Sequence, residues 1–141
     1  MKIATLALAL ILVGCGASTP TTPAVPVPPN SPQTQVLNIT KTLADSINAA
    51  VKTAISLRDS GKIDQATTLT IENWAKSAAV LDDTIATELG SADPWPLQKQ
   101  KILVILPAFR IPGTSYVNTT LQAALTAVGT ILSQLQVQVA Q

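Results

Sequence analysis

Apolar side chains recur at intervals of three and four residues through the first part of the chain, from Val36 to Leu57. At 100° per residue they fall on one helical face about 120° wide. Ser31 and Pro32 supply an N-cap and a proline at the first helical position, and Gly61 can accept the left-handed conformation of a C-cap. The sequence therefore predicts an amphipathic helix over about 32–59. Its apolar positions are Val36, Ile39, Leu43, Ile47, Ala50, Val51, Ala54 and Leu57.

A second apolar stripe follows after a short connection. Asp64 can cap this helix at its start and Gly90 can end it. Because the connection 61–64 is tight, the first two helices should form an antiparallel hairpin. The apolar positions of the second stripe are Ile71, Trp74, Ala78, Leu81, Ile85 and Leu89.

The segment 93–113 has two possible structures. Asp93 and Pro94 resemble another cap with a first-turn proline, and Pro96 is still tolerated in a first turn. The run KILVIL at 101–106 fits either a buried strand or a helix, because a short apolar run does not decide between them. With helices on both sides and no second strand to pair with, helix is favoured, and Pro107 and Pro112 should kink or end it.

The last predicted helix runs from about Ser115 to Val139, with Ser115 as its cap. Its apolar stripe contains Val117, Leu121, Ala124, Leu125, Val128, Ile131, Leu132 and Leu135. The opposite face is polar but uncharged, and no charged residue follows Arg110. This face is either a solvated surface in a chain with 12% charged residues or a contact surface for a partner, a second copy or the membrane. The candidate contact residues are Thr119, Gln122, Thr126, Thr130 and Ser133.

Together these stripes predict an all-α fold, a small antiparallel helical bundle of three long helices and one short, proline-kinked helix. The bundle should occupy residues 31–141, which is enough chain for one domain with one core. Hydrophobic residues make up 47% of the chain and aromatic residues only 3%. The core should therefore be aliphatic and rich in alanine.

The amino-terminal end has a different pattern. Met1 and Lys2 precede an uncharged apolar run, Ile3 to Val13, with small residues after it. This is the layout of a secretory signal peptide. A membrane-spanning helix needs about 20 apolar residues, so the run is too short for a permanent span. We expect residues 1–14 to be a cleaved signal peptide.

The end of this run carries the only cysteine of the chain, Cys15. Leu12, Val13 and Gly14 before Cys15 resemble a bacterial lipobox, the cleavage and acylation motif of lipoproteins processed by signal peptidase II. The resemblance implies that a diacylglyceryl group is joined to the Cys15 sulfur and that Cys15 becomes the first mature residue. Glycine rather than aspartate at position 16 resembles the sorting signal for the outer membrane in Gram-negative bacteria. The alternatives are an ordinary signal peptide with an incidental cysteine, or an uncleaved anchor.

Residues 15–30 join the anchor to the bundle, and this segment is rich in proline and threonine. Proline fixes φ and lacks an N–H donor, so we expect an extended, disordered, solvated linker. At about 3.1 Å per residue it could hold the domain roughly 45 Å from the bilayer.

The residue types argue against catalysis. The chain has no histidine, which is the commonest general base and metal ligand. Asp82 and Asp83 are adjacent, so on a helix they point about 100° apart and form no carboxylate dyad. Glu72 and Lys76 are expected to pair on the surface, and Glu88 to be solvated at a helix end. We therefore predict no enzyme activity, no metal and no cofactor.

The charge balance also excludes nucleic acid as a partner. After cleavage the chain keeps eight Lys and Arg residues and eight Asp and Glu residues, without the basic patch that nucleic acid requires.

Three functions remain. The first is a lipid-anchored interaction or structural module of the cell envelope. The second is a bundle that binds a small apolar ligand or lipid between its aliphatic stripes, which a cavity lined by Trp74 and the run 102–109 would favour. The third is a phage- or prophage-encoded envelope lipoprotein acting in superinfection exclusion or lysis.

Overall fold

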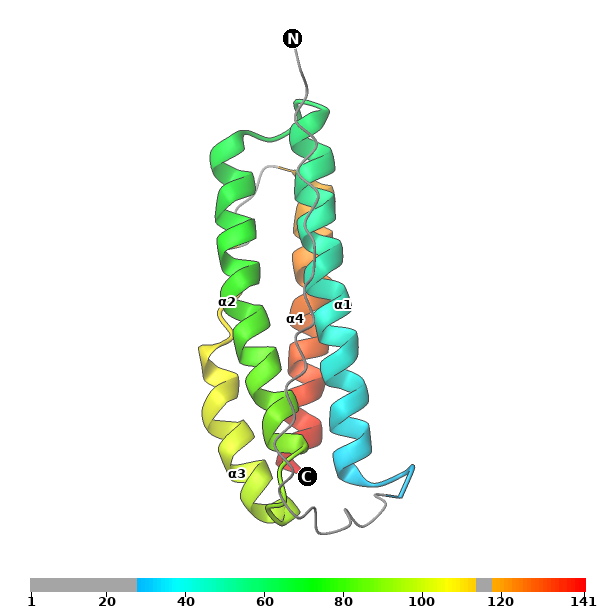
Figure 1. Ribbon diagram of the computed structural model, residues 1–141. Coiled ribbons are helices and arrows are strands. Elements are labelled where there is room, and N and C mark those ends of the chain that lie inside the picture. Colours follow the sequence, from blue (N-terminus) through cyan, green and yellow to red (C-terminus); the bar gives the residue numbers. More distant parts are fainter. Residues whose placement is uncertain (1–27, 114–117) are drawn as a thin grey trace, which may run out of the picture.

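The structure, a computed structural model, describes residues 28–113 and 118–141, and within them the chain is an all-α antiparallel bundle (Figure 1). The helices run alternately up and down, and the third is the short one. This confirms the predicted bundle of three long helices and one short helix. The elements are α1 (Pro32–Asp59), α2 (Gln65–Leu89), α3 (Trp95–Ile105), the 3-10 helix η1 (Leu106–Ala108) and α4 (Thr119–Ala140).

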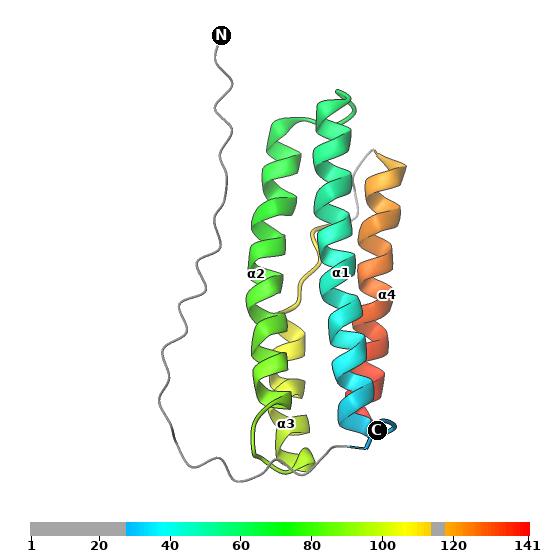
Figure 2. The same ribbon diagram turned by 45° about the vertical axis from the view of Figure 1, so that its right-hand side comes forward.

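Helix α1 lies between α2 and α4 and packs along both (Figure 2). The shorter α3 packs against both α2 and α4. It occupies only the half of the bundle where α1 begins and α4 ends (Figure 1). The described chain therefore enters the bundle at the same end at which it finishes.

The ends of α1 follow its sequence. The Ser31 hydroxyl accepts a hydrogen bond from the Thr34 N–H at 3.1 Å, which satisfies one of the free donors of the first turn. At the other end the Lys62 N–H donates to the Leu57 carbonyl and the Gly61 N–H to the Arg58 carbonyl, both at 2.8 Å. This is a Schellman motif, and it requires the left-handed conformation that Gly61 adopts with φ of 69°.

Helix α2 begins and ends as its sequence predicts. The Asp64 carboxylate accepts from the Thr67 N–H at 2.7 Å. Hydrogen bonding to Thr67 lowers the pKa of Asp64 below its usual value, because the bonds favour the charged form. The helix ends at Leu89, with Gly90 at the C-cap.

The third segment is a helix, which decides between the two predicted alternatives, but its cap was misplaced by one residue. Pro94 stands at the N-cap position, and α3 begins at Trp95 with Pro96 in its first turn. The Asp93 carboxylate accepts from Lys101 Nζ at 2.6 Å instead of capping. The α-helix gives way to η1 at Leu106, just before Pro107, because proline lacks an N–H and clashes with the preceding turn.

The start predicted for the last helix was wrong by about one turn. The Asn118 side chain accepts from the N–H groups of Thr120 and Leu121 at 3.0 and 3.2 Å, so Asn118 is the N-cap and α4 begins at Thr119. Ser115 and Val117 lie outside the described residues. Asn is among the strongest N-cap residues, and the local sequence offers several caps within a few positions.

The predicted stripes form a single aliphatic core. The largest buried side chains come from every α-helix, and Leu43, Ile71, Ile85 and Leu125 have no exposed surface. Burying one such side chain contributes about 1.5–3 kcal/mol. The other members include Val36, Ala50, Ala54, Ala78, Ile102, Leu106, Phe109, Leu121, Val128, Leu132, Leu135 and Val139.

The segment after η1 packs against the core and against α4. Phe109 is buried in the core and Ile111 packs against it. A Cβ added to Gly129 of α4 would lie 3.1 Å from Ile111 Cδ1. The absence of a side chain at Gly129 therefore lets this segment approach α4 closely.

Candidate functional site

The predicted anchor site lies outside the described residues. Cys15 and the three residues before it, Leu12, Val13 and Gly14, precede residue 28, where the described chain begins. Acylation of Cys15 remains a prediction from the sequence.

The candidate contact surface of α4 is exposed along its whole length. Thr119, Gln122, Thr126, Thr130 and Ser133 are all exposed, while the apolar stripe behind them is buried. The helical phase predicted from the sequence is therefore correct. The exposed face carries no charge, because no charged residue follows Arg110.

Three of the four hydroxyl groups of this face, those of Thr126, Thr130 and Ser133, are bound to their own helix. Thr126 donates to the Gln122 carbonyl at 2.8 Å, Thr130 to the Thr126 carbonyl at 3.1 Å and Ser133 to the Gly129 carbonyl at 3.0 Å. Each hydroxyl has one proton to donate, so these donors are already used. A partner would meet methyl groups and hydroxyl acceptors here, which makes the surface less polar than its sequence suggests.

Two open grooves border the α4 face, each with apolar residues in its wall. One has a volume of about 550 Å³ and lies between the 111–113 segment and α4, where Thr126, Thr130 and Ser133 meet Ile111. The other, of about 500 Å³, lies between α1 and α4, where Thr130 and Ser133 meet Ile39 and Val137. Thr119 and Gln122 line neither of these grooves. Sequence reasoning missed Ile39 and Ile111, since their place beside α4 depends on tertiary packing.

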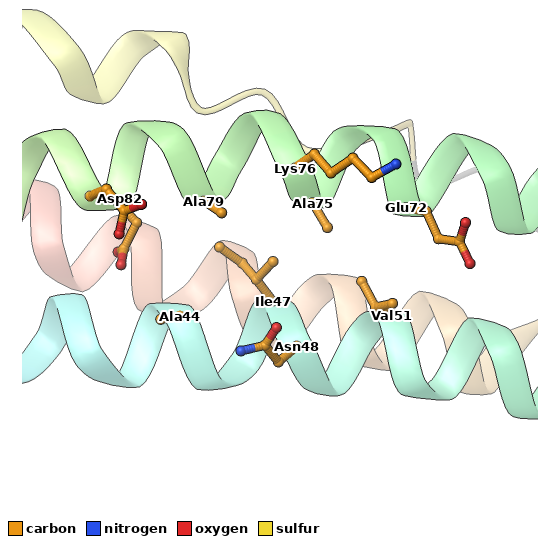
Figure 3. A pocket seen from close by; sticks show the side chains of 10 residues that line it. Ala44, Ile47, Asn48, Val51, Glu72, Ala75, Lys76, Ala79 and Asp82 are labelled. Carbon is orange, nitrogen blue, oxygen red and sulfur yellow. The ribbon is translucent and has the colours of Figure 1, made fainter. Parts of the chain in front are cut away.

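A third groove, between α1 and α2, was not predicted (Figure 3). Its volume is about 460 Å³, and it opens to solvent. Five of its ten lining residues are apolar: Ala44, Ile47 and Val51 from α1, and Ala75 and Ala79 from α2. Its polar lining residues are Asn48, Glu72, Lys76, Asp82 and Asp83.

Asp82 stands at one end of this groove and is the most unusual ionisable group in the described chain. Asp82 is buried, with 9% of its surface exposed, and its Oδ1 atom has no hydrogen-bond partner. Burial, and to a lesser degree the nearby Asp83 charge, raises the pKa of Asp82 from 3.8 to about 6. As predicted, the two aspartates do not form a dyad, since Asp83 is exposed while Asp82 is buried.

The predicted surface pair of Glu72 and Lys76 is not formed. The ion pairs within the described ranges join Arg58 to Asp59 and Lys101 to two carboxylates. In Figure 3 the Lys76 side chain extends toward the Glu72 end of the α1–α2 groove, while the Glu72 carboxylate points away from it. Lys76 is the only cation in the lining of this groove, and it belongs to the Glu72 end rather than the Asp82 end.

Glu88 was predicted to be solvated, and the structure corrects this. Lys101 Nζ lies 2.9 Å from Glu88 Oε2 and 2.6 Å from Asp93 Oδ2. The hydrogen bonds to Asp93 and then to Glu88 raise the pKa of Lys101. This cluster joins α3 to the end of α2 and is a structural feature rather than a site.

Gln98 performs a similar joining role in the interior. It is 1% exposed, accepts from Gln33 Nε2 at 2.8 Å and donates to the Ser91 carbonyl at 3.1 Å. It thereby connects the first turn of α1 to the α2–α3 turn. Sequence reasoning missed it, because a glutamine on a helix is usually a surface residue.

The cavity predicted around Trp74 and the run 102–109 is not among the three grooves. Ile102, Leu106 and Phe109 are core residues, and Trp74 packs against the same core.

Among the described residues, α4 is long and apolar enough to span a membrane by length and composition, with a mean hydropathy of 1.3. Its apolar stripe is instead packed in the bundle core.

The described part of the chain contains no group of three or more His, Cys, Asp or Glu side chains suited to a metal ion.

Comparison with known proteins does not narrow the function. No family model matches the chain, and neither the curated proteins nor the solved structures include a significant match.

Proposed function

We propose that this protein is a lipid-anchored lipoprotein of the bacterial cell envelope whose helical bundle is a non-catalytic interaction module. The anchor would be Cys15, and the contact surface would be the uncharged face of α4. The lipobox at 12–15 supports the anchor. The observation that carries the interaction role is an exposed, uncharged helix face bordered by two grooves with apolar residues in their walls.

Physical chemistry favours contact over simple solvation for this face. The centres of protein interfaces are depleted in charged residues, and α4 carries none. The hydroxyl donors are already bonded within the helix, so covering them would not break hydrogen bonds to water through those protons. The adjoining side chains of Ile39, Ile111 and Val137 would supply apolar contact area.

The proposed anchor is compatible with this use of α4. The described chain enters the bundle at the start of α1, beside the end of α4 (Figure 2). The contact face runs along the side of the bundle instead of capping this end. A linker of residues 15–30 would leave that side open to a partner at the membrane surface. With Gly16 after the cysteine, we place the protein at the outer membrane if the bacterium is Gram-negative.

Replacing Cys15 tests the anchor. Cys15→Ser should leave the precursor uncleaved before position 15 and unlabelled by radioactive palmitate, because the acyl groups need a sulfur or the amino group freed by cleavage. The matched control is Ser18→Ala in the linker, which should be labelled like the parent. Palmitate incorporation into Cys15→Ser would contradict the proposal.

Adding charge to the α4 face tests the contact surface. In Thr126→Lys/Thr130→Lys, association measured by crosslinking in the native membrane should fall at least tenfold, while the melting temperature of the monomer stays within about 2 °C. Lysines at the exposed α2 positions Asn73 and Ser77 serve as the control. Equal crosslinking of the parent and the α4 variant would show that the face is only solvated.

A second function, binding of a small ligand, is favoured by one specific observation. The α1–α2 groove has the volume of a small-molecule site, and Asp82 at its end has an oxygen without a partner.

A further inference from the structure

We propose that the groove between α1 and α2 is a binding site for an organic cation, an amine with a short apolar body, whose ammonium group contacts Asp82. This site is separate from the α4 contact surface and from the lipid anchor. It does not depend on either of them.

The shape and the walls of the groove define the body of the ligand. The groove has a volume of about 460 Å³, which is within the usual range for small-molecule sites. Alanines 44, 75 and 79 leave room for a ligand between the two helices, and Ile47 and Val51 add apolar contact. Glu72 and Asp82 are ten positions apart on α2, so the groove is roughly 15 Å long. An aliphatic or aromatic group of a few carbons fits this space.

The charge at one end defines the head group. Asp82 is nine-tenths buried and its Oδ1 has no hydrogen-bond partner, whereas buried polar atoms are normally bonded. Asp83 adds a second carboxylate at the same end. The α1 side of the lining, Ala44, Ile47, Asn48 and Val51, contains no cation. Oδ1 itself has almost no exposed surface, so a ligand in the groove that brings a positively charged donor would contact the other oxygen of the Asp82 carboxylate and offset both charges.

Lys76 does not supply this charge. It lies six positions from Asp82, or about 9 Å along the helix axis, and the ion pairs in the described ranges do not include it. In Figure 3 Lys76 lies nearer to the Glu72 end than to Asp82. Counting all lining residues, the groove holds three carboxylates and one ammonium, which favours a cationic ligand over a neutral or anionic one.

Other occupants fit less well. The linker 16–30 contains no charged residue, and neither do acyl chains, so neither could neutralise Asp82. A second copy of the protein would need a contact of about 800 Å² on each partner, far more than a groove of this length provides. A small amine meets both requirements, size and charge.

The experiment uses the full lipidated chain in lipid nanodiscs, with alanine methyl groups labelled with carbon-13. Hexylamine is the probe, and 1-hexanol and hexanoate are matched for chain length. Hexylamine should shift the methyl signals of Ala44, Ala75 and Ala79 in a saturable manner at pH 7.5. Hexanol should bind at least tenfold more weakly, and hexanoate should cause no saturable shift.

Three variants separate the charge from the groove. Asp82→Asn should weaken hexylamine binding at least tenfold without changing the response to hexanol. Ala79→Trp should fill the groove and abolish both responses, with a melting temperature near that of the parent because Ala79 is exposed. Asp45→Asn, an exposed aspartate on α1 outside the groove lining, should bind like the parent.

Three results would overturn the proposal. Equal affinities for hexylamine and hexanol, or unchanged hexylamine affinity in Asp82→Asn, would mean that Asp82 recognises no cation. Absence of methyl shifts, together with loss of a crosslinked dimer in Asp82→Asn, would instead assign the groove to a second copy. None of these results bears on palmitate labelling or on the α4 variant, so the proposed anchor and the proposed α4 contact surface stand or fall separately, whereas the second function, small-ligand binding, rests on this groove.

Discussion

The buried carboxylate of Asp82 should make the stability of the bundle depend on pH in a simple way, and Asp82→Asn should remove that dependence. Asparagine keeps the shape of the side chain and has a similar helix propensity, but it cannot ionise. Burial raises the pKa of Asp82 from 3.8 to about 6. The folded state therefore holds this proton at pH values where the unfolded chain has already released it.

The sign and size of the effect follow from linkage. Where the folded state binds more protons than the unfolded state, stability falls as pH rises. The favourable contribution is complete below pH 3.8 and is lost as pH rises through about 6. Each pKa unit corresponds to about 1.36 kcal/mol, so the full loss is about 3 kcal/mol, of which about 2 falls between pH 4.5 and 7.5.

Few other groups interfere in this pH range. The chain has no histidine, so the side chain that usually titrates between pH 5 and 8 is absent. The lowered pKa of Asp64 adds stability that is lost only as pH falls below 3.8. The raised pKa of Lys101 adds stability that is lost only as pH rises above 10.5. The slope between pH 4.5 and 7.5 therefore reports Asp82.

Urea denaturation at several pH values measures this effect, with a chain that begins at Asn30 so that the anchor does not interfere. The free energy of unfolding of the parent should fall by about 2 kcal/mol from pH 4.5 to 7.5, and that of Asp82→Asn should stay nearly constant. The control Asp45→Asn should keep the slope of the parent. A parent that is equally stable across this range, or an Asp82→Asn variant with the same slope, would refute the reasoning.

Two further predictions concern the core and its polar connection. Leu43→Asp should prevent the cooperative melt of the 30–141 chain followed by circular dichroism, because it places an unpaired charge at a position with no exposed surface, whereas Val80→Asp at a 65% exposed position should melt like the parent. Gln98→Ala should lower the free energy of unfolding by about 1–3 kcal/mol, since it leaves the Gln33 donor unpaired, and the exposed control Gln100→Ala should change it by less than about 0.5 kcal/mol.

The helices could be predicted from the sequence because their apolar stripes repeat at a period close to 3.6. The stripes on α1 and α2 became the core, and the caps at Ser31 and Asp64 are confirmed. The starts of α3 and α4 were less certain, since several residues that can cap lie within a few positions of each other. Asp93 instead pairs with Lys101, an interaction eight positions away that local sequence rules do not consider.

The α1–α2 groove could not be predicted, because it depends on how two helices sit against each other. Asp82 nevertheless carried a signal. It lies four positions after Ala78 and three before Ile85, both of them buried, so the helical period already placed it on the core side. Its charge suggested a surface position, and the periodicity was the better guide. The exposed face of α4 was found correctly, since exposure follows from the same period.

The α1–α2 groove and the exposed face of α4 differ in charge, which indicates that these two surfaces bind different ligands. Helix α1 separates them, with the acidic groove toward α2 and the uncharged face toward α4. Removing water from an uncharged face costs little free energy, so such a face suits a broad contact. A buried carboxylate costs much free energy unless a cation pairs with it. The bundle does not need a buried carboxylate for its stability. We therefore infer that Asp82 is present at this position to bind a ligand. An amine bound in the groove should lower the pKa of Asp82, and it should abolish the dependence of the parent's stability on pH. Ligand binding and the pH profile of stability are thus two independent measurements on the same carboxylate.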